Sequence, residues 1–282
     1  MIEALIDGLP ATGQLISLSV ADGALLRGDG CFETIRSYHG EPFMLGPHLE
    51  RLQRSAAALR LNPPDQRLLS DWVRQMAAAG GDCAVRVVCT RGAVIPGSEV
   101  VGRCLVVAHP IPVVPDSLRL RPVPAPWHPA GREWELAGVK SLSYAPNQAA
   151  GRVAQEAGFD DALLISSGGG KGLVLEGPTF AVGWVVGGRL ELPSLELGVL
   201  DSITRRVVIE LAGREGIEVV AGRFPLSRLD RADEVVAMST VKEVCGVVAV
   251  GDRRYPVGSV TEFLATTYRL RTVAPASAPT HG

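Results

Sequence analysis

Three polar groups of different chemistry follow one another through the middle of the chain. Lys140 carries an amine, Glu176 carries a carboxylate at the end of an apolar run, and Ser202 and Thr204 stand where a helix can begin. An amine can form a Schiff base with an aldehyde, and a carboxylate can keep a pyridine nitrogen protonated. Backbone N–H groups at a helix start bind phosphate. Residues 139–205 therefore contain the groups that a phosphorylated pyridine aldehyde requires.

Lysine is scarce in this chain, which narrows the search for a nucleophilic amine. Of the 28 basic residues only three are lysines, namely Lys140, Lys171 and Lys242. Lys171 lies in the run GGGKG, which lacks the GxxxxGK[ST] spacing of a phosphate loop, so we predict a hairpin turn with Lys171 at its tip. Taken alone, Lys140 could be a surface residue, but the carboxylate and the helix start that follow it favour a chemical role.

Composition and charge argue against several other classes of function. The net charge of −2 provides no electrostatic footprint for nucleic acid or an anionic membrane. The apolar runs are too short to span a membrane. The five histidines lack the spacing of metal ligands, so no metal site is expected. No serine stands in a GxSxG turn, which argues against a serine hydrolase of that type.

Cysteine usage and the N-terminus predict a cytoplasmic protein. The five cysteines form no CxxC pair and lie mostly in apolar runs, so buried free thiols in a reducing compartment are expected. The first residues, MIEA, show no basic segment followed by an apolar one, so we expect no signal peptide.

The first part of the chain predicts a small α/β domain. Gly8 and Gly13 punctuate short apolar pieces and indicate an early hairpin within residues 1–20. Apolar residues recur at helical spacing from His48 until the Pro63–Pro64 pair ends the pattern, and Arg51 lies off that apolar stripe. The further predicted elements are a helix over residues 66–79 and strands over residues 31–38, 84–90 and 103–108.

A proline-rich segment predicts the boundary between two domains. Residues 110–131 contain seven prolines. Because proline donates no backbone hydrogen bond, we do not expect this segment inside a sheet or a helix. The predicted division is a small α/β domain at 1–112, a connection at 113–131, a larger domain at 132–272 and a disordered tail at 273–282. A long surface crossing is the alternative for the connection.

The second part of the chain mixes strands with helices. Ser202 is a suitable N-cap for a helix over residues 203–215. Further helices are predicted over residues 146–157 and 259–270. Strands are predicted over residues 162–166, 173–176, 180–186 and 189–192, around 219–220, and over 234–238 and 247–255.

Six motifs in a fixed order make the chain resemble a known family. They are GDGCFET at 28–34, HLERL at 48–52, KSLSY at 140–144, EGPT at 176–179, ITR at 203–205 and STVKEV at 239–244. The sequence is similar to class IV, fold-type IV enzymes that depend on pyridoxal 5′-phosphate. The resemblance implies an α/β (α+β) fold with a small N-terminal domain, a larger C-terminal pseudo-barrel domain, and a homodimer that binds a small-molecule amine.

The resemblance also implies roles for particular residues. Lys140 would carry the Schiff base and move protons, Glu176 would pair with the pyridine nitrogen, and Tyr144 would approach the phenolic oxygen. The residues implied to hold the phosphate are Arg51, Ile203, Thr204, Ser239 and Thr240. Phe32, Arg91 and Arg36 are the candidates for substrate binding. Two positions depart from the family pattern: Ala181 replaces an asparagine, and Asp201–Ser202 replaces Pro-Gly.

The family contains members with different reactions. The motifs GDGCF and RVVCTRG look most like aminodeoxychorismate lyase, which releases pyruvate and 4-aminobenzoate for folate synthesis. The strand FETIRSY also resembles branched-chain aminotransferases, and D-amino acid aminotransferases belong to the same family. We therefore expect the lyase, with an aminotransferase as the first alternative and a non-catalytic family member as the second.

Overall fold

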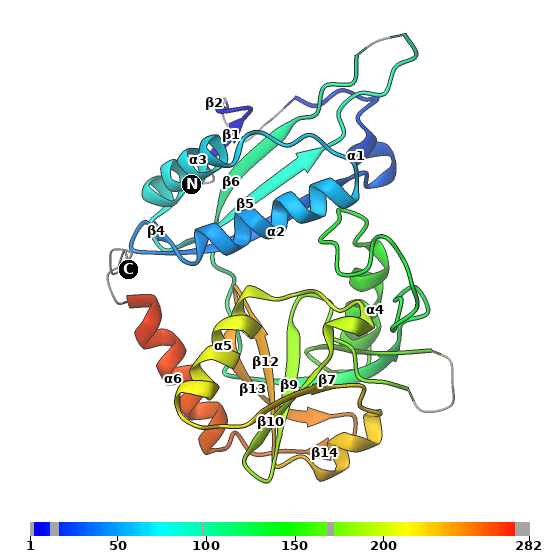
Figure 1. Ribbon diagram of the computed structural model, residues 1–282, viewed down its shortest axis with the longest axis vertical. Coiled ribbons are helices and arrows are strands. Elements are labelled where there is room, and N and C mark those ends of the chain that lie inside the picture. The colour runs from blue at the N-terminus through cyan, green and yellow to red at the C-terminus, as the bar shows by residue number, and fades with distance from the viewer. Residues whose placement is uncertain (1–2, 12–16, 98, 168–171, 274–282) are drawn as a thin grey trace.

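The computed structural model describes residues 3–11, 17–97, 99–167 and 172–273. It consists of two units stacked along the long axis of the molecule, the N-terminal one above the C-terminal one in Figure 1. Both mix helices with strands, which confirms the predicted α/β class. The predicted hairpin tip at Lys171 lies outside the described residues, as does the predicted tail beyond residue 273.

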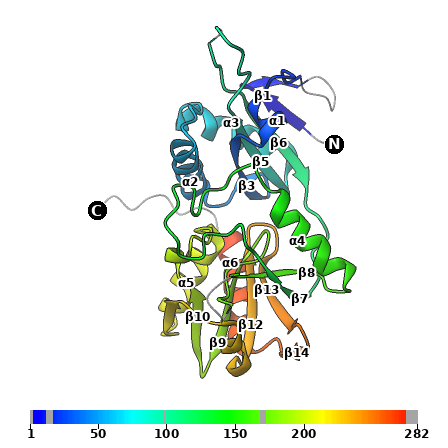
Figure 2. The ribbon, with the colours of Figure 1, turned by 90° about the vertical axis from the view of Figure 1, so that its right-hand side faces the viewer.

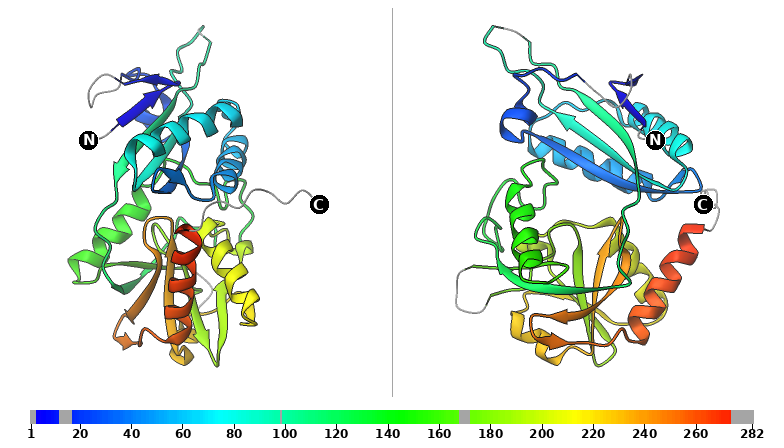
Figure 3. Two further views of the ribbon diagram at one scale, coloured as in Figure 1. Left: turned by 90° about the vertical axis from the view of Figure 1, so that its left-hand side faces the viewer. Right: turned by 180° about the vertical axis from the view of Figure 1, so that it is seen from behind.

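The upper unit is built on a six-stranded antiparallel sheet with the strand order β2-β1-β6-β5-β3-β4. Its strands are β1 (Glu3–Ile6), β2 (Leu9–Pro10), β3 (Gly30–Tyr38), β4 (Glu41–Pro42), β5 (Cys83–Thr90) and β6 (Cys104–Pro110). Helices α2 (Leu45–Ala58) and α3 (Gln66–Gly80) cover one face of this sheet, and Figure 3 shows the other face without a described helix over it. The short α1 (Gly23–Arg27) precedes β3 and is not among the predicted elements.

Alternation along β3 divides its side chains between the core and the space below the sheet. Ile35 is fully buried and packs in one cluster with Leu49 and Leu52 of α2. Phe32 and Thr34 point to the opposite face of the sheet, which faces a cavity. The same strand therefore builds the core of the upper unit and a wall of that cavity.

The lower unit contains an eight-stranded mixed sheet that curves as a half-barrel, with the order β11-β10-β9-β12-β13-β7-β8 and β14 paired to β13. Its strands are β7 (Ser117–Pro124), β8 (Asp161–Ile165), β9 (Ala181–Val186), β10 (Arg189–Pro193), β11 (Val219–Gly222), β12 (Glu234–Ser239), β13 (Glu243–Val250) and β14 (Arg253–Arg254). Its α-helices are α4 (Ala145–Glu156), α5 (Ile203–Arg214) and α6 (Ser259–Val273), with 3₁₀ turns at Leu195–Leu197 and Leu226–Arg231.

Apolar clusters hold these layers together. Helices α5 and α6 pack on the sheet through a cluster that includes Leu211 and Leu264, while Trp184 lies in a second cluster together with residues of β7, β12 and β13. Helix α4 contacts β7 and β8 on the side seen in Figure 2. Successive residues of β12 belong to different clusters, so apolar side chains pack on both faces of the sheet.

The proline-rich segment differs from its prediction, because residues 117–124 form strand β7 within the sheet. Pro122 pairs with Leu163 of β8, whereas the pairing of β7 with β13 ends at Leu120. Side chains and peptide groups two residues apart along a strand point the same way. The nitrogen of Pro122 therefore points to the same side of β7 as that of Leu120, the last residue of β7 that pairs with β13. Because β13 no longer pairs with β7 at Pro122, the missing N–H costs the sheet no hydrogen bond. The predicted domain boundaries themselves remain a prediction.

The strand predicted over residues 173–176 is reduced to isolated bridges. Val174 pairs with Ile165, and Leu173 pairs with Pro225. Backbone hydrogen bonds nevertheless join this segment to β8, since the N–H of Leu164 donates to the carbonyl of Glu176 at 2.8 Å and the N–H of Leu175 donates to the carbonyl of Leu164 at 3.0 Å. Glu176 therefore lies at the end of a buried segment that is bonded to β8 without being assigned as a strand.

Two expectations from composition can be compared with the structure. All five cysteines are free and buried, which confirms the prediction of buried thiols. Within the described part of the chain, no helix is both long and apolar enough to cross a membrane.

Candidate active site

A cavity of about 1020 Å³ lies between the two units and is lined by both. It collects most of the residues singled out from the sequence. Those that line it are Phe32, Arg51, Lys140, Tyr144, Glu176, Ser202, Ser239 and Thr240. Residues from five separate motifs therefore meet in one place, although more than 200 positions separate the first from the last.

Backbone hydrogen bonds to the start of β3 position Lys140. The N–H of Phe32 donates to the carbonyl of Lys140 at 3.0 Å, and the N–H of Leu142 donates to the carbonyl of Gly30 at 2.8 Å. The Lys140 N–H in turn donates to Oγ of Ser55 at 3.2 Å. The lysine segment therefore belongs structurally to the upper unit's sheet, even though α4 of the lower unit follows it.

The amine of Lys140 points between aromatic rings. Its Nζ lies 4.2 Å from the centroid of Phe32 and 5.6 Å from that of Tyr144. Burial in the cavity wall lowers the pKa of Lys140 to about 8, and the nearby guanidinium of Arg51 contributes in the same direction. A lowered pKa leaves more of the amine neutral near neutral pH, and the neutral amine is the nucleophilic form.

A buried ionic cluster lies directly behind Lys140. Glu33 is completely buried and accepts hydrogen bonds from Nε and Nη2 of Arg51, both at 2.7 Å. Nδ1 of His48 lies 2.9 Å from the same carboxylate. Burial alone would raise the pKa of Glu33, but the charge and hydrogen bonds of Arg51 lower it to about 2. Glu33 therefore stays ionised and holds the Arg51 guanidinium in a single orientation.

Arg51 connects this cluster to the start of helix α5. Its Nη1 donates to the carbonyl of Asp201 at 2.8 Å. Oγ of Ser202 accepts from the N–H of Arg205 at 3.3 Å, so Ser202 is the N-cap, as predicted. The Asp201 carboxylate, the extra negative charge noted in the sequence, is held by Arg206, with Nε at 2.8 Å from Oδ1. The negative charge of Asp201 is thus compensated by an arginine in the first turn of the helix that follows it.

A second segment of the lower unit faces the same region. Ser239 ends β12, Thr240 follows it, and both line the cavity. Ile203 and Thr204 are buried in the first turn of α5 and are not among the residues that line the cavity, so their part in holding a phosphate stays a prediction. The α5 start and this turn provide the kind of backbone and hydroxyl donors that bind phosphate.

Glu176 is held by a backbone group and lies beside a histidine. Its Oε2 accepts from the N–H of Leu200 at 3.0 Å, and its Oε1 lies 3.4 Å from Nε2 of His128. Nδ1 of His128 accepts from the N–H of Ala130, so Nε2 carries the proton. Among the described residues this buried Nε2 has no well-aligned acceptor. Sequence reasoning missed His128 because only the fold brings it next to Glu176.

Tyr144 closes another side of the cavity. Its ring meets that of Phe32 edge-to-face at 5.4 Å between centroids. Burial raises the pKa of Tyr144, so its hydroxyl remains protonated across the pH range in which enzymes work. It can therefore donate a hydrogen bond to an anionic oxygen in the cavity.

The structure does not bring Arg91 or Arg36 to the cavity lining. Arg91 forms a two-point ion pair with Asp29, at 2.5 and 3.1 Å, and donates to the carbonyls of Leu59 and Arg60. Arg36 lies over the ring of Tyr38 at 4.9 Å. Their predicted substrate contacts stay a prediction, but both guanidinium groups are engaged elsewhere.

Other cations that were not predicted as site residues do line the cavity. They are Arg27 of α1, Arg86 of β5 and Lys242 after β12. Arg86 lies 5.3 Å over the ring of Phe32. Because Arg86 pairs with Thr34 across the sheet, strand alternation places it on the cavity face. Arg86 could have been identified from the sequence only if the register between β3 and β5 had been known.

The donor set fits pyridoxal 5′-phosphate and defines the class of protein. An amine of lowered pKa, a carboxylate beside a proton-bearing imidazole, and a helix start joined to an arginine occupy one cavity. These are groups that can bind the aldehyde, the ring nitrogen and the phosphate. A mixed α/β fold with such a cavity between two units is that of a fold-type IV enzyme.

Comparison with known proteins identifies the family. The family model described as amino-transferase class IV matches residues 30–250 of this chain. The chain therefore belongs to this family, whose members depend on pyridoxal phosphate.

Relatives of this chain have more than one activity in their names. A putative branched-chain-amino-acid aminotransferase of Methanocaldococcus jannaschii is 34% identical, over 89% of this chain and 90% of that protein. An aminodeoxychorismate lyase of Bacillus subtilis is 28% identical, over 89% and 88%. The structure of a fold IV transaminase from Curtobacterium pusillum has a TM-score of 0.86 at 29% identity, covering 96% of this chain and 98% of that one.

Proposed function

We propose that this protein is a pyridoxal-phosphate-dependent lyase that converts 4-amino-4-deoxychorismate into 4-aminobenzoate and pyruvate. The GDGCF and RVVCTRG motifs support this choice within the family. The lyase of Bacillus subtilis is similar over nearly the whole chain. The proposal assigns the reaction to the cavity between the two units.

The observation that carries the proposal is the set of charged and aromatic groups around Lys140. Arg27 and Arg86 line the cavity from the upper unit, and neither forms an ion pair with a described carboxylate. The proposed substrate carries two carboxylates and a ring. Two guanidinium groups suit the carboxylates, and the rings of Phe32 and Tyr144 suit a planar ring next to the amine.

Each residue then has a distinct task. Arg51, the start of α5, Ser239 and Thr240 would hold the phosphate, and Glu176 would hold the ring nitrogen. When bound, the cofactor supplies an electron sink that stabilises negative charge on the substrate carbon. Lys140 Nζ removes the proton from that carbon, since its lowered pKa makes it a competent base near neutral pH.

The decisive experiment supplies 4-amino-4-deoxychorismate in the absence of any keto-acid acceptor and measures pyruvate. The lyase is expected to release pyruvate and 4-aminobenzoate in equal amounts. Lys140→Ala should release neither, whereas Arg214→Ala serves as a control because Arg214 is exposed at the end of α5 and is not among the residues that line the cavity. A wild-type protein that makes no pyruvate, yet transfers amino groups to 2-oxoglutarate, would reject the lyase.

That rejection would establish the second candidate, a class IV aminotransferase for branched-chain or D-amino acids. The similarity to the Methanocaldococcus jannaschii protein favours this alternative. Such an enzyme would use Lys140 both to remove the proton and to return it to the cofactor side. Matched assays with L-leucine, L-valine and D-alanine separate the two stereochemical classes.

A further inference from the structure

The turn between β12 and β13 forms one wall of the cavity. Residues 240–242 connect the paired residues Ser239 and Glu243. Oγ of Ser239 accepts from the N–H of Lys242 at 3.0 Å, so the hydroxyl helps to shape the turn from within. Ser239 and Thr240 line the cavity here, so the conformation of the turn decides where their donors point.

Glu243 adopts an unusual backbone conformation for its residue type. Its φ is 54°, in the left-handed region. In short hairpin loops a type I turn is commonly followed by one left-handed residue, and glycine takes this conformation most easily because it has no Cβ. Here a glutamate takes the left-handed conformation, and its side chain is bound by residues of two other elements.

The interactions of Glu243 come from two other elements. The hydroxyl of Tyr38, the last residue of β3, donates to Oε1 of Glu243 at 2.7 Å. Nε of Arg269 in α6 donates to Oε2 at 3.1 Å. Burial raises the pKa of Tyr38, so the hydroxyl remains a donor at every working pH. The upper unit thereby reaches the turn of the lower unit through a hydrogen bond to a carboxyl group.

Neighbouring groups hold the Tyr38 ring in place. The ring of Phe43 meets it edge-to-face at 5.9 Å, and the guanidinium of Arg36 lies over the ring at 4.9 Å from its centroid. Phe43 also meets Tyr268 of α6 at 5.6 Å, which ties the same corner to the lower unit. Nη1 of Arg36 lies 3.5 Å from the carbonyl of Val241, at the outer limit of a hydrogen bond.

We propose that Tyr38 is a positioning residue that sets the β12–β13 turn from the other unit, so that Ser239 and Thr240 can bind the cofactor phosphate. The inference rests on the proposed function in that it takes this turn as part of the phosphate site. Tyr38 itself does not line the cavity, and its effect is transmitted through Glu243. Docking of the two units and binding of the phosphate are coupled by this contact.

The test compares two ligands that differ only in the phosphate. Pyridoxal phosphate and pyridoxal share the aldehyde and the ring, so a defect in the phosphate site affects the first and spares the second. For Tyr38→Phe we expect the Kd of pyridoxal phosphate to rise about tenfold, the scale of one hydrogen bond to a charged group, with the Kd of pyridoxal unchanged. Both are measured by absorbance titration of cofactor-free protein.

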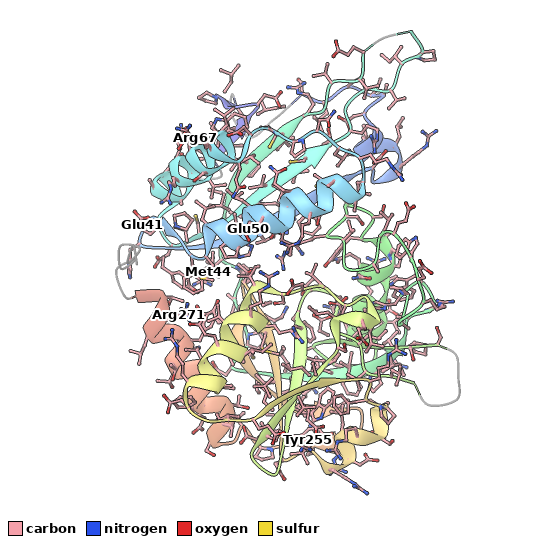
Figure 4. All side chains as sticks on the ribbon, in the orientation of Figure 1. Glu41, Met44, Glu50, Arg67, Tyr255 and Arg271 are labelled. Atoms are coloured by element: carbon pink, nitrogen blue, oxygen red, sulfur yellow. The ribbon has the colours of Figure 1, made fainter. Side chains whose placement is uncertain are left out.

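Tyr255→Phe is the matched control. The Tyr255 hydroxyl donates to the carbonyl of Leu229 within the lower unit at 3.1 Å, and Figure 4 shows this residue at the end of the molecule away from the upper unit. This variant loses a buried tyrosine hydrogen bond as well, but we expect neither Kd to change. Glu243→Gln provides a second test if Tyr38→Phe folds poorly. It should likewise raise the Kd of pyridoxal phosphate and leave the Kd of pyridoxal unchanged.

The possible outcomes separate the two proposals. Equal losses for both ligands, or no loss for either, would overturn the role of Tyr38 while leaving the cofactor assignment intact. A wild-type protein that binds pyridoxal phosphate no better than pyridoxal would remove the phosphate site and the inference with it. A selective loss in Tyr38→Phe and Glu243→Gln, absent from Tyr255→Phe, is the supporting result.

Discussion

At the scale of single residues, the chemistry depends on how burial and charge change the protonation of two side chains. Lys140 is pushed toward its neutral form, because the cavity wall disfavours an ammonium group. Glu33, one layer behind it, is kept charged because Arg51 and His48 satisfy its oxygens. Burial thus lowers the pKa of the amine, whereas the buried acid stays ionised because an arginine and a histidine bind it.

The lowered pKa of Lys140 predicts a pH profile for covalent capture of the cofactor. The capture rate should rise about tenfold per pH unit below pH 8 and level off above it, since only the neutral amine attacks. Timed trapping with borohydride on cofactor-free protein measures this rate. A rise that continues to about pH 10, the range of an ordinary lysine, would contradict the assignment.

Replacing Glu33 by glutamine should be strongly destabilising. Removing one partner of a buried ion pair costs about 3–5 kcal/mol. Because the pKa of Glu33 falls to about 2 in the folded state, its stabilisation is present above its ordinary pKa and is lost as the pH falls toward 2. Urea unfolding of wild type and Glu33→Gln should therefore differ most near neutral pH and converge in acid.

The exposed pair of Glu41 and Arg74, 3.6 Å apart, provides the control for that measurement. Glu41 lies at the edge of the upper unit in Figure 4. Glu41→Gln should change the free energy of unfolding by less than about 1 kcal/mol at any pH, as is usual for surface pairs. If the two variants were equally mild, Glu33 would not be the ionised anchor of Arg51.

At the scale of elements, the lysine segment depends on close contact with β3. A Cβ added to Gly30 would lie 2.5 Å from the carbonyl oxygen of Cys89 and 2.6 Å from Leu142. Backbone on one side and the lysine segment on the other leave no room for a methyl group. Gly30 therefore lets the segment that carries Lys140 dock directly on the strand that carries Phe32.

Gly30→Ala should push this segment away from the strand. We expect a loss of about 1–3 kcal/mol in stability, typical of overpacking, together with weaker borohydride trapping of the cofactor. Gly46→Ala is the matched control, because Gly46 lies in the first turn of α2 with no atom within 4 Å of the added Cβ. That variant should be neutral or slightly stabilising, with normal trapping. Equal effects at both positions would argue against the docking role.

At the scale of the whole molecule, exposed apolar side chains gather on one side of the upper unit. Leu25 and Leu26 of α1 are 64% and 60% exposed, and Val94 and Ile95 in the loop after β5 are both 49% exposed. Hydrogen bonds join the two segments, since Val94 N–H donates to the carbonyl of Ala21. Contiguous apolar surface of this kind is typical of an interface.

We expect this surface to be buried in a homodimer. Light scattering should give twice the chain mass of 29.8 kDa, and Leu26→Asp should shift the protein toward the monomer. Val113→Asp is the control, because Val113 is 99% exposed but lies on the connection between the units. A dimer unaffected by Leu26→Asp would place the interface elsewhere, and a wild-type monomer would reject the homodimer.

Much of the fold and site could be predicted from the sequence, because periodicity and caps act over a few residues. Local features include the N-cap of α5 at Ser202 and the alternation of β3. Lys140 and Glu176 could likewise be recognised from their own short motifs. The placement of β7 could not be predicted, since the tolerance for Pro122 depends on where a neighbouring strand ends.

The sequence by itself determined the amine, the carboxylate, the helix start and the family to which their order belongs. Only the tertiary structure decided which arginine side chains line the cavity. Arg51, off the apolar stripe of its helix, is buried because Glu33 neutralises it, whereas Arg91 is occupied by Asp29 and Arg86 reaches the cavity in its place. These choices depend on contacts between residues far apart along the chain. Residue type and spacing alone do not reveal such contacts, because they form only when the strands pair and the two units dock.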